Sequence, residues 1–430
     1  MKEIIENSFQ AFKKWKKTDP EIRAKLLLSL AQLLKQNKDK FAKLMAQEMG
    51  KPISEGRAEI EKCAWACTYF GQEGPRMLKD SSRESDLKTT FIRHEALGPI
   101  LAIMPWNYPF WQVFRMAAPV IMAGNAILLK HSETTPACAQ AIADLFIQAG
   151  ALDNLLQKLE ATHEQIPDII SNNRIRGVTL TGSTRAGQIV AKLAGKYLKK
   201  IVLELGGSDP FIILKDAPLE KVALLAAQAR CQNGGQSCIA AKRFIIHSLV
   251  FDKFLDYFVS AMNSLVVGDP LLESTQIGPM ANKKQQLLID AQVNDARLKG
   301  AKILCGGVLG PGSGFYYPPT VITQISSSMR VHDEEVFGPV ACVYSYSNID
   351  EALDIANATP FGLASSIWSA DEAYAKSLVD DLEFGSVFIN AIPRSDPRLP
   401  FGGVKNSGFG RELGQTGLFE FVNQKVISIA

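Results

Sequence analysis

Residues 200–243, KIVLELGGSDPFIILKDAPLEKVALLAAQARCQNGGQSCIAAKR, contain the pattern that decides the fold. The apolar run at 201–205 predicts a buried strand, which ends at the turn pair Gly206-Gly207. A second strand is expected at 211–214, and an alanine-rich helix from about 218 to 231. Short strands alternating with helices are typical of an α/β protein.

A carboxylate and a thiol stand out within this stretch. Glu204 lies in the first strand, and Cys238 ends the glycine-rich loop NGGQSC at 233–238. Glycines let a substrate approach the backbone, so the pair is typical of a base and a nucleophile. Alternatively, Cys238 is a small buried hydrophobe and Glu204 a capping residue. The turn-rich loop favours the nucleophile.

The alternation extends in both directions. Before Glu204, strands are expected at 100–104, 126–129, 155–160 and 176–181, with helices at 110–123, 136–149 and 185–198. Short connections of this kind predict a mostly parallel sheet with helices on both faces, which binds ligands at the carboxyl ends of its strands. A second α/β unit follows residue 206, with strands near 211–214, 243–247, 302–305, 340–346, 364–368 and 386–390.

Composition excludes several classes of protein. A chain of 430 residues predicts two or three domains, and 47 basic against 44 acidic residues give no electrostatic case for nucleic acid or an anionic membrane. No apolar run is long enough to span a membrane, and the first ten residues lack a signal peptide's apolar core. Seven scattered cysteines without zinc-ligand spacing predict a cytoplasmic protein and no metal site.

Two further polar turns follow predicted strands. The prolines on either side of Asn107 in PWNYP (105–109) would fix its amide as an oxyanion donor, although Asn beside Pro more often satisfies a turn. Gly182 and Ser183 lie at a strand-to-helix turn that suits a pyrophosphate, a weak signal by itself.

Lys130 and Glu133 follow the strand at 126–129 and are placed to hold an adenosine ribose. A carboxylate accepts from a ribose 2′-hydroxyl and repels a 2′-phosphate, so Glu133 predicts NAD as the preferred cofactor. Lys130 and His131 would soften that preference, with NADP as an alternative.

Taken together, ELGGSDP (204–210), GQSC (235–238), PWNYPF (105–110) and EEVFGP (334–339) resemble the aldehyde dehydrogenase superfamily, in the family's order along essentially the whole chain. The resemblance implies two doubly wound α/β domains, a Rossmann-like cofactor domain and a catalytic domain, plus a small β oligomerisation arm. The implied boundaries are 1–80 and 97–205 for the cofactor domain, 206–412 for the catalytic domain, and 81–96 with 413–430 for the arm. The arm, whose polar alternation could also be a plain surface hairpin, implies a homodimer or homotetramer.

The same resemblance assigns roles to residues. Cys238 would attack an aldehyde as a thiolate, Asn107 would hold the oxyanion, and Glu204 would activate water to hydrolyse the resulting thioester. We expect the glycine-rich loop to favour the thiolate. The dinucleotide-binding residues implied are Pro105, Trp106, Lys130, Glu133, Gly182, Ser183, Leu205, Gly206, Glu335 and Phe337.

Arg115 bears on the substrate, because a cation in an apolar helix is costly unless it meets an anion. It would clamp a substrate carboxylate, or else extend to solvent. The motifs PWNYPFWQVFR and LPFGGVKNSGFGREL are most similar to the short type of bacterial succinate-semialdehyde dehydrogenases, which implies that Arg115 and Ser395 bind the substrate carboxylate. Gln232 departs from the pattern, since some members carry another Arg there.

Other functions are weighed against this one. Another semialdehyde or a medium-chain aldehyde would suit the same chemistry. A cysteine acyl hydrolase without a dinucleotide would need an imidazole base, and no His lies near the Cys238 motif. A non-catalytic scaffold has no need of Cys238, Glu204 and Asn107 together.

Overall fold

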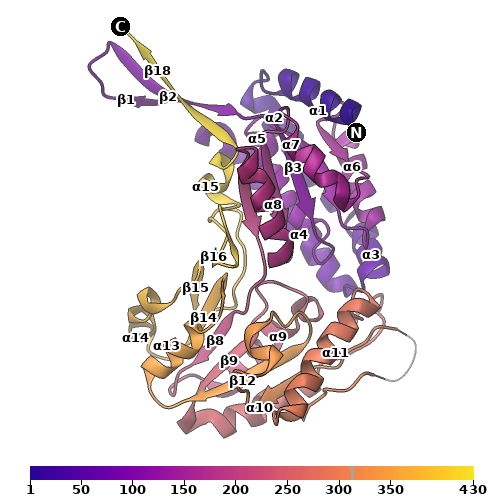
Figure 1. Ribbon diagram of the computed structural model, residues 1–430, viewed down its shortest axis with the longest axis vertical. Helices are drawn as coiled ribbons and strands as arrows, with labels where there is room; N and C mark the ends of the chain where they lie inside the picture. The colour runs from indigo at the N-terminus through magenta and orange to yellow at the C-terminus, as the bar shows by residue number, and fades with distance from the viewer. Residues whose placement is uncertain (311–313) are drawn as a thin grey trace.

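The computed structural model describes residues 1–310 and 314–430, which form two α/β units and an extended β arm (Figure 1). The sheet of the first unit has the strand order β17-β7-β6-β3-β4-β5. Its strands are β3 (Pro99–Met104), β4 (Ala126–His131), β5 (Leu156–Lys158), β6 (Gly177–Thr181), β7 (Lys200–Glu204) and β17 (Gly408–Phe409). Its helices are α1 (Lys2–Trp15), α2 (Pro20–Gln36), α3 (Lys38–Met49), α4 (Ile53–Met77), α5 (Trp111–Met122), α6 (Pro136–Gln148), α7 (Ile166–Ser171) and α8 (Thr184–Lys196).

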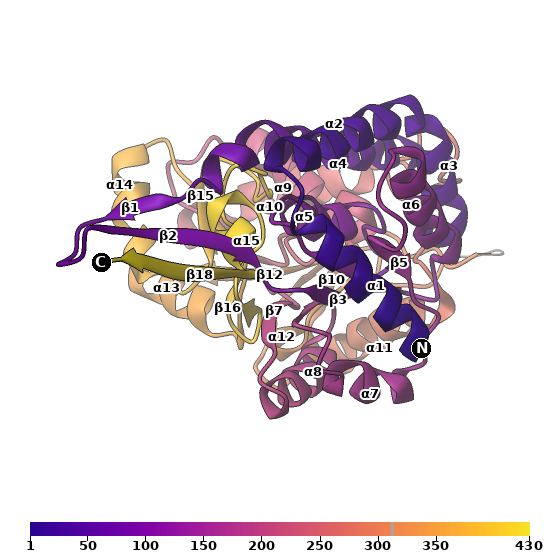
Figure 2. The same ribbon diagram turned by 90° about the horizontal axis from the view of Figure 1, so that it is seen from above.

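Helices cover both faces of this sheet, as the apolar runs predict. Ile127 and Leu129 of β4 pack into the core formed with α2, α4, α5 and α6. Leu128, the residue between them, packs into a second core formed with α7 and α8. Figure 2 shows α2 and α4 on one side of β3, and α7 and α8 on the other. The parallel strands are therefore buried on both faces.

The second unit contains a sheet of order β10-β11-β12-β9-β8-β14-β15. Its strands are β8 (Pro210–Ile213), β9 (Arg243–His247), β10 (Lys302–Cys305), β11 (Thr320–Thr323), β12 (Val340–Tyr346), β14 (Ala364–Trp368) and β15 (Ser386–Ile389). Its helices are α9 (Leu219–Cys231), α10 (Phe251–Asn263), α11 (Lys283–Leu298), α12 (Arg330–Asp333), α13 (Ile349–Asn357) and α14 (Glu372–Ser377). The sequence analysis did not predict β11, which separates β10 from β12.

The arm is a three-stranded antiparallel sheet of β1 (Ser81–Arg83), β2 (Thr89–Ala96) and β18 (Val422–Ile429), and it projects from the first unit (Figure 1). Val426 and Ile429 are exposed on it. Helix α15 (Gly414–Phe419) packs on α5, so within 413–430 only β18 belongs to the projecting sheet. In the described part of the chain, no helix is both long and apolar enough to cross a membrane.

The chain returns from the second unit to the first before residue 412. Strand β16 (Val404–Lys405) pairs with β13 (Phe361–Gly362), and β17 then adds antiparallel to β7, the strand that carries Glu204. Gly408 makes this pairing possible, because it has φ +113° and a Cβ there would lie 2.0 Å from the backbone oxygen of Leu203.

Gly408→Ala is therefore expected to destabilise the protein by at least about 2 kcal/mol, through the strained backbone and the clash with β7. Gly195→Ala is the matched control, since no atom lies within 4 Å of its missing Cβ on α8. That variant should gain up to about 1 kcal/mol from helix propensity. Scanning calorimetry compares the two, and equal melting temperatures would show that the β17–β7 junction tolerates a side chain.

Candidate active site

The carboxyl ends of β3, β4, β6 and β7 carry most of the predicted site residues. From β3 the chain first builds β4 and β5 on one side, and then β6 and β7 on the other. The strand order thus reverses beside β3, and such a reversal opens a crevice at the carboxyl edge of a parallel sheet. Pro105, Trp106 and Asn107 follow β3 directly into this crevice.

The loop that carries Cys238 is held by backbone geometry and by one lysine. After α9 the chain turns through left-handed Asn233 (φ 56°) and Gly234 (φ 61°). The ammonium of Lys242, which is 1% exposed, donates to the carbonyl oxygens of Ser237 (3.1 Å), Cys238 (2.8 Å) and Ala240 (3.2 Å). The position of the thiol is therefore fixed by contacts on both sides.

Asn107 lies against this loop. Its side-chain Nδ2 donates to the backbone carbonyl oxygen of Gln236 at 3.0 Å, and its backbone carbonyl oxygen accepts from Asn233 Nδ2 at 2.7 Å. An amide nitrogen has two N–H donors, so one remains for an oxyanion beside Cys238. The structure brings these two predicted residues together across 131 positions of the sequence.

Two carboxylates of α4 connect the loops, and the sequence analysis missed both. The carboxylate of Glu55 accepts from the backbone N–H of Asn233 at 2.8 and 3.1 Å. Glu59 Oε1 accepts from the N–H groups of Phe110 and Trp111 at 2.9 and 2.8 Å, and Lys51 pairs with its other oxygen. Their spacing of four on a largely buried helix was the available signal.

The thiol of Cys238 is partly exposed but sits in a poorly hydrated position. Burial raises its pKa to about 12, against the opposing effects of Arg115 and Lys242. Our expectation that the loop would favour a thiolate is therefore wrong for this structure. Desolvation of the anion outweighs the nearby cations, so the resting group is the thiol.

Glu204 is 2% exposed and belongs to a cluster of buried charges. Arg115, 1% exposed, pairs through Nε with Glu412, lies 3.8 Å from Glu204 through Nη2, and donates to Thr181 at 3.3 Å. The alternative that Arg115 extends to solvent is wrong. Burial raises the pKa of Glu204 well above its ordinary value, and Arg115 opposes that shift. One carboxylate oxygen of Glu204 has no hydrogen-bond donor in the described structure.

The predicted adenosine and phosphate contacts lie at the carboxyl ends of β4 and β6, the two strands that flank β3. Lys130 is 7% exposed and donates only weakly, to the His131 carbonyl at 3.3 Å, while Glu133 lies 3.7 Å away with an 83% exposed side chain. The backbone N–H of Gly182 donates to the carbonyl oxygen of Glu204, so this N–H is not free to donate to a phosphate in the described structure. Ser183 caps α8, whose first-turn N–H groups point into the crevice.

Glu335 and Phe337 reach this crevice from the second unit. Glu335 Oε1 accepts from Gly207 N at 3.0 Å, and a Cβ on Gly206 would lie 2.6 Å from its other oxygen. Trp106 and Phe337 meet edge to face at 5.8 Å. Leu205 is 5% exposed and packs under α8. A buried ammonium with unused donors, a capped helix start and a glycine-lined wall fit a dinucleotide.

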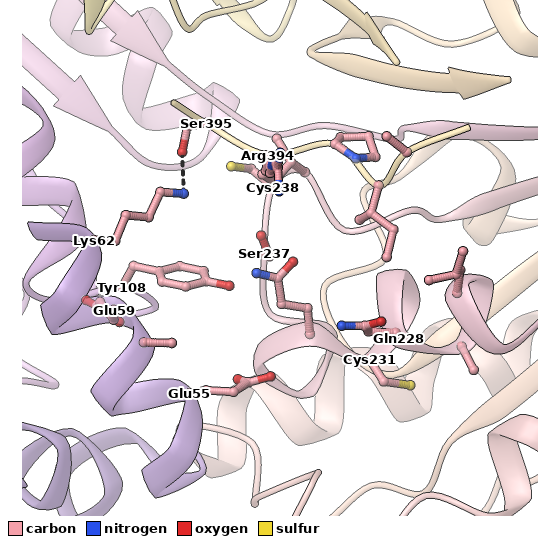
Figure 3. Close-up of a pocket in the computed structure, with 18 of the residues that line it drawn as sticks. Glu55, Glu59, Lys62, Tyr108, Gln228, Cys231, Ser237, Cys238, Arg394 and Ser395 are labelled. Carbon is pink, nitrogen blue, oxygen red and sulfur yellow. Dashed lines mark hydrogen bonds between the residues drawn. The ribbon is translucent and has the colours of Figure 1, made fainter. Parts of the chain in front are cut away.

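A cavity of about 890 Å³ opens beside this crevice (Figure 3). Cys238, Arg115 and Ser395 line it, together with Trp111 and Lys62. Ser395 accepts a hydrogen bond from the Lys62 ammonium at 2.8 Å. No cluster of three or more His, Cys, Asp or Glu side chains suited to a metal ion occurs within residues 1–310 and 314–430.

Comparison with known proteins gives the class of this one. Residues 1–427 match the aldehyde dehydrogenase family, and the chain belongs to that family. It oxidises aldehydes in the manner of that family.

The names of its relatives specify a substrate and a cofactor. A probable succinate-semialdehyde dehydrogenase [NADP(+)] of Synechocystis is 44% identical over 428 residues, which are 100% of this chain and 94% of that protein. A succinate-semialdehyde dehydrogenase [NADP(+)] 1 of Mycobacterium ulcerans is 46% identical over 94% of this chain and 89% of its own length. The solved structure of the succinic semialdehyde dehydrogenase from Streptococcus pyogenes, in complex with NADP+, superposes with a TM-score of 0.97 at 35% identity, over 100% of this chain and 94% of that one.

The hydrogen bonds between Glu55 on α4 and the backbone of Asn233 lead to a prediction about pH. Burial raises the pKa of Glu55 from 4.5 to about 7, so ionising it costs more in the folded than in the unfolded chain. The stability that the neutral form provides is therefore lost as pH rises from about 4.5 to about 7. Glu55→Gln cannot ionise, so its melting temperature should rise relative to that of the unmodified protein across this window. Glu61→Gln, on the exposed face of α4, is the control and should give a flat difference. A flat difference for both would contradict the prediction.

Proposed function

We propose that this protein oxidises succinate semialdehyde to succinate with NADP as its cofactor. The observation that carries the proposal is the cavity in which the Cys238 thiol shares a wall with Arg115 and Ser395. A reactive sulfur and carboxylate-binding groups in one cavity fit an aldehyde with a carboxylate at its far end. The names of the relatives support the same substrate.

The chemistry follows from the groups around Cys238. The sulfur attacks the aldehyde carbon, and its proton passes through water to the ionised carboxylate of Glu204. The free N–H of the Asn107 amide and the backbone N–H of Cys238 stabilise the oxyanion of the thiohemiacetal. A bound nicotinamide would supply the hydride acceptor, and loss of the hydride would convert the thiohemiacetal into a thioester on Cys238. Glu204 first releases the thiol's proton to solvent and then takes a proton from the water that hydrolyses this thioester; the acid leaves, and the departing sulfur regains a proton as the thiol.

These two proton transfers, one from the thiol and one from water, require the Glu204 side chain to move. In the described structure its carboxyl group lies toward Arg115, within the cluster completed by Glu412. The Glu204 carboxylate oxygen that accepts no hydrogen bond would break none by turning toward water near Cys238. The weak 3.8 Å contact to Arg115, in place of a hydrogen bond, keeps that movement inexpensive.

The residues proposed to hold the dinucleotide come from both units. Lys130 and the start of α8 would meet the adenosine and phosphate portions, and Glu335, Gly206 and Trp106 the nicotinamide half. Our prediction of NAD as the preferred cofactor does not agree with the relatives, whose names specify NADP(+). The prediction of NAD gave too much weight to Glu133. The Glu133 carboxylate is exposed and can turn away from a phosphate, whereas the Lys130 ammonium is buried.

Glu133 should nevertheless weaken NADP binding by like-charge repulsion. Because the side chain is exposed, Glu133→Gln is expected to raise the ratio of kcat/KM with NADP to kcat/KM with NAD only about 2- to 5-fold. Initial rates with each cofactor measure this ratio. Glu95→Gln, which removes a carboxylate paired with Lys425 in the arm, is the control and should leave it unchanged. An unchanged ratio in Glu133→Gln would place the 2′-phosphate elsewhere.

Two variants separate the proposed roles of thiol and carboxylate. Cys238→Ala should give no hydride transfer while still binding NADP, because no thiohemiacetal can form. Glu204→Gln should slow the first turnover, because the thiol proton loses its acceptor, and should accumulate the acyl adduct, because the thioester is no longer hydrolysed; we expect steady-state turnover to fall at least about 100-fold. Stopped-flow absorbance and intact-protein mass measure the turnover and the acyl adduct. Sustained turnover by Cys238→Ala would refute the nucleophile assignment.

The substrate is tested with a panel of aldehydes. Succinate semialdehyde should give a higher kcat/KM than glutarate semialdehyde, butanal and hexanal, each measured with NADP and with NAD. A preference for hexanal would instead favour a medium-chain aldehyde as the substrate.

We also propose a cytoplasmic homodimer or homotetramer. The seven cysteines are all unpaired, as in a reducing compartment, and the arm presents exposed Val426 and Ile429 on an eight-residue edge strand.

A further inference from the structure

Lys62 is a partly buried cation of the cavity that the sequence did not point to; Arg115 is buried and Arg394, which also lines the cavity, is exposed. Lys62 lies on α4 one turn beyond Glu59, so Glu55, Glu59 and Lys62 share one face of that helix. Its ammonium reaches Ser395 Oγ at 2.8 Å and lies 4.6 Å from the centre of the Trp111 ring. Figure 3 shows the side chain extending from α4 to Ser395 in the cavity that Cys238 also lines.

The charge balance distinguishes Lys62 from Arg115. Arg115 faces two carboxylates, those of Glu412 and Glu204, so its charge is already compensated. Among residues 1–310 and 314–430, no carboxylate lies within ion-pair distance of the Lys62 ammonium. A partly buried ammonium has three donors, and Ser395 takes one of them. An anion entering the cavity would therefore gain more from Lys62 than from Arg115.

We propose that Lys62 is a specificity-determining cation of this enzyme: with Ser395, and in the same cavity as Arg115, it binds the distal carboxylate of the substrate. This inference rests on the proposed function, whose substrate it explains. The two donors, an ammonium and a hydroxyl already 2.8 Å apart, can each serve one carboxylate oxygen. Gln232 lines the same cavity at the position where some members of the family carry another Arg. Because Gln232 is neutral, Lys62 supplies a cation that this position lacks.

The ionisation of Lys62 gives the proposal a signature. Burial lowers its pKa to about 8, Arg115 lowers it further, and Cys63, Glu59 and Asp396 oppose the shift. These groups belong to α4, α5 and the loop after β15, and that loop also carries the exposed Arg394 at the cavity wall. Below that pH the ammonium is present. Above it the cation is lost, and so is the preference for a charged aldehyde.

The test compares succinate semialdehyde with butanal, which has the same chain length without the carboxylate. Lys62→Gln should lower kcat/KM for succinate semialdehyde about 30- to 1,000-fold, the range for removing one partner of a desolvated charge pair, and change it less than about 3-fold for butanal. Lys62→Arg should retain most of the selectivity. Lys38→Gln, which removes an exposed lysine that pairs with Glu61 on α4, is the matched control and should change neither value.

The pH profile separates binding from a structural role. In the unmodified enzyme, the ratio of kcat/KM for succinate semialdehyde to that for butanal should fall above about pH 8, and Lys62→Arg should abolish that fall. Titration of Cys238 and Glu204 affects both aldehydes, so it cancels in the ratio. Calorimetric binding of succinate to the enzyme without cofactor should weaken in parallel in Lys62→Gln, a readout independent of turnover.

The outcomes are distinguishable. Succinate semialdehyde preferred by the unmodified enzyme, with equal losses for both aldehydes in Lys62→Gln, would overturn the inference and leave the proposed function intact. Butanal preferred by the unmodified enzyme would overturn the proposed function. In that case, unchanged succinate binding by Lys62→Gln would overturn the role of Lys62 as a carboxylate-binding group as well.

Discussion

The hydrogen bonds that Glu55 and Glu59 accept from the backbone of two separate loops are the constraint on which the site depends. Glu59 fixes the start of α5, and therefore the turn that carries Asn107. Glu55 fixes Asn233 in the loop that carries Cys238. The two loops belong to different α/β units, and a single helix sets their separation. An oxyanion donor is useful only within a few tenths of an ångström of its position, which a helix provides better than a loop.

Buried charges are the second theme of this site, and most of them are compensated. Lys51 pairs with Glu59, Arg115 with Glu412, and Lys242 is surrounded by three carbonyl oxygens. Such groups are costly to bury unless partnered, and once partnered they fix geometry. Glu204, Lys130 and Lys62 are among the groups that keep unused hydrogen-bonding capacity. They are the groups proposed to meet water, the dinucleotide and the substrate.

The sequence predicted what local patterns encode. Strand ends, the Pro-flanked Asn107 and the glycine-rich loop of Cys238 all have signals within a few residues, and the structure brings these segments to one edge. It could not predict contacts between distant segments: Arg115 and Glu412 are 297 positions apart, and nothing near either residue specifies the other. The direction of the Cys238 pKa shift was missed for the same reason, since desolvation depends on the whole surrounding fold. Strand β11 was missed although its four residues, Thr320–Thr323, are all β-branched.

The pairing of β17 with β7 bears on how this protein can be divided. The first sheet is completed by residues 408–409, and the carboxylate that neutralises Arg115 arrives at residue 412, after the entire second unit. A fragment ending near residue 205 would therefore leave β7 as an open edge and Arg115 buried without its main partner. The first unit is therefore completed by residues that follow the second unit, although the rest of it is nearly continuous in the sequence. Recombination that exchanged only the second unit would have to preserve this returning segment as well.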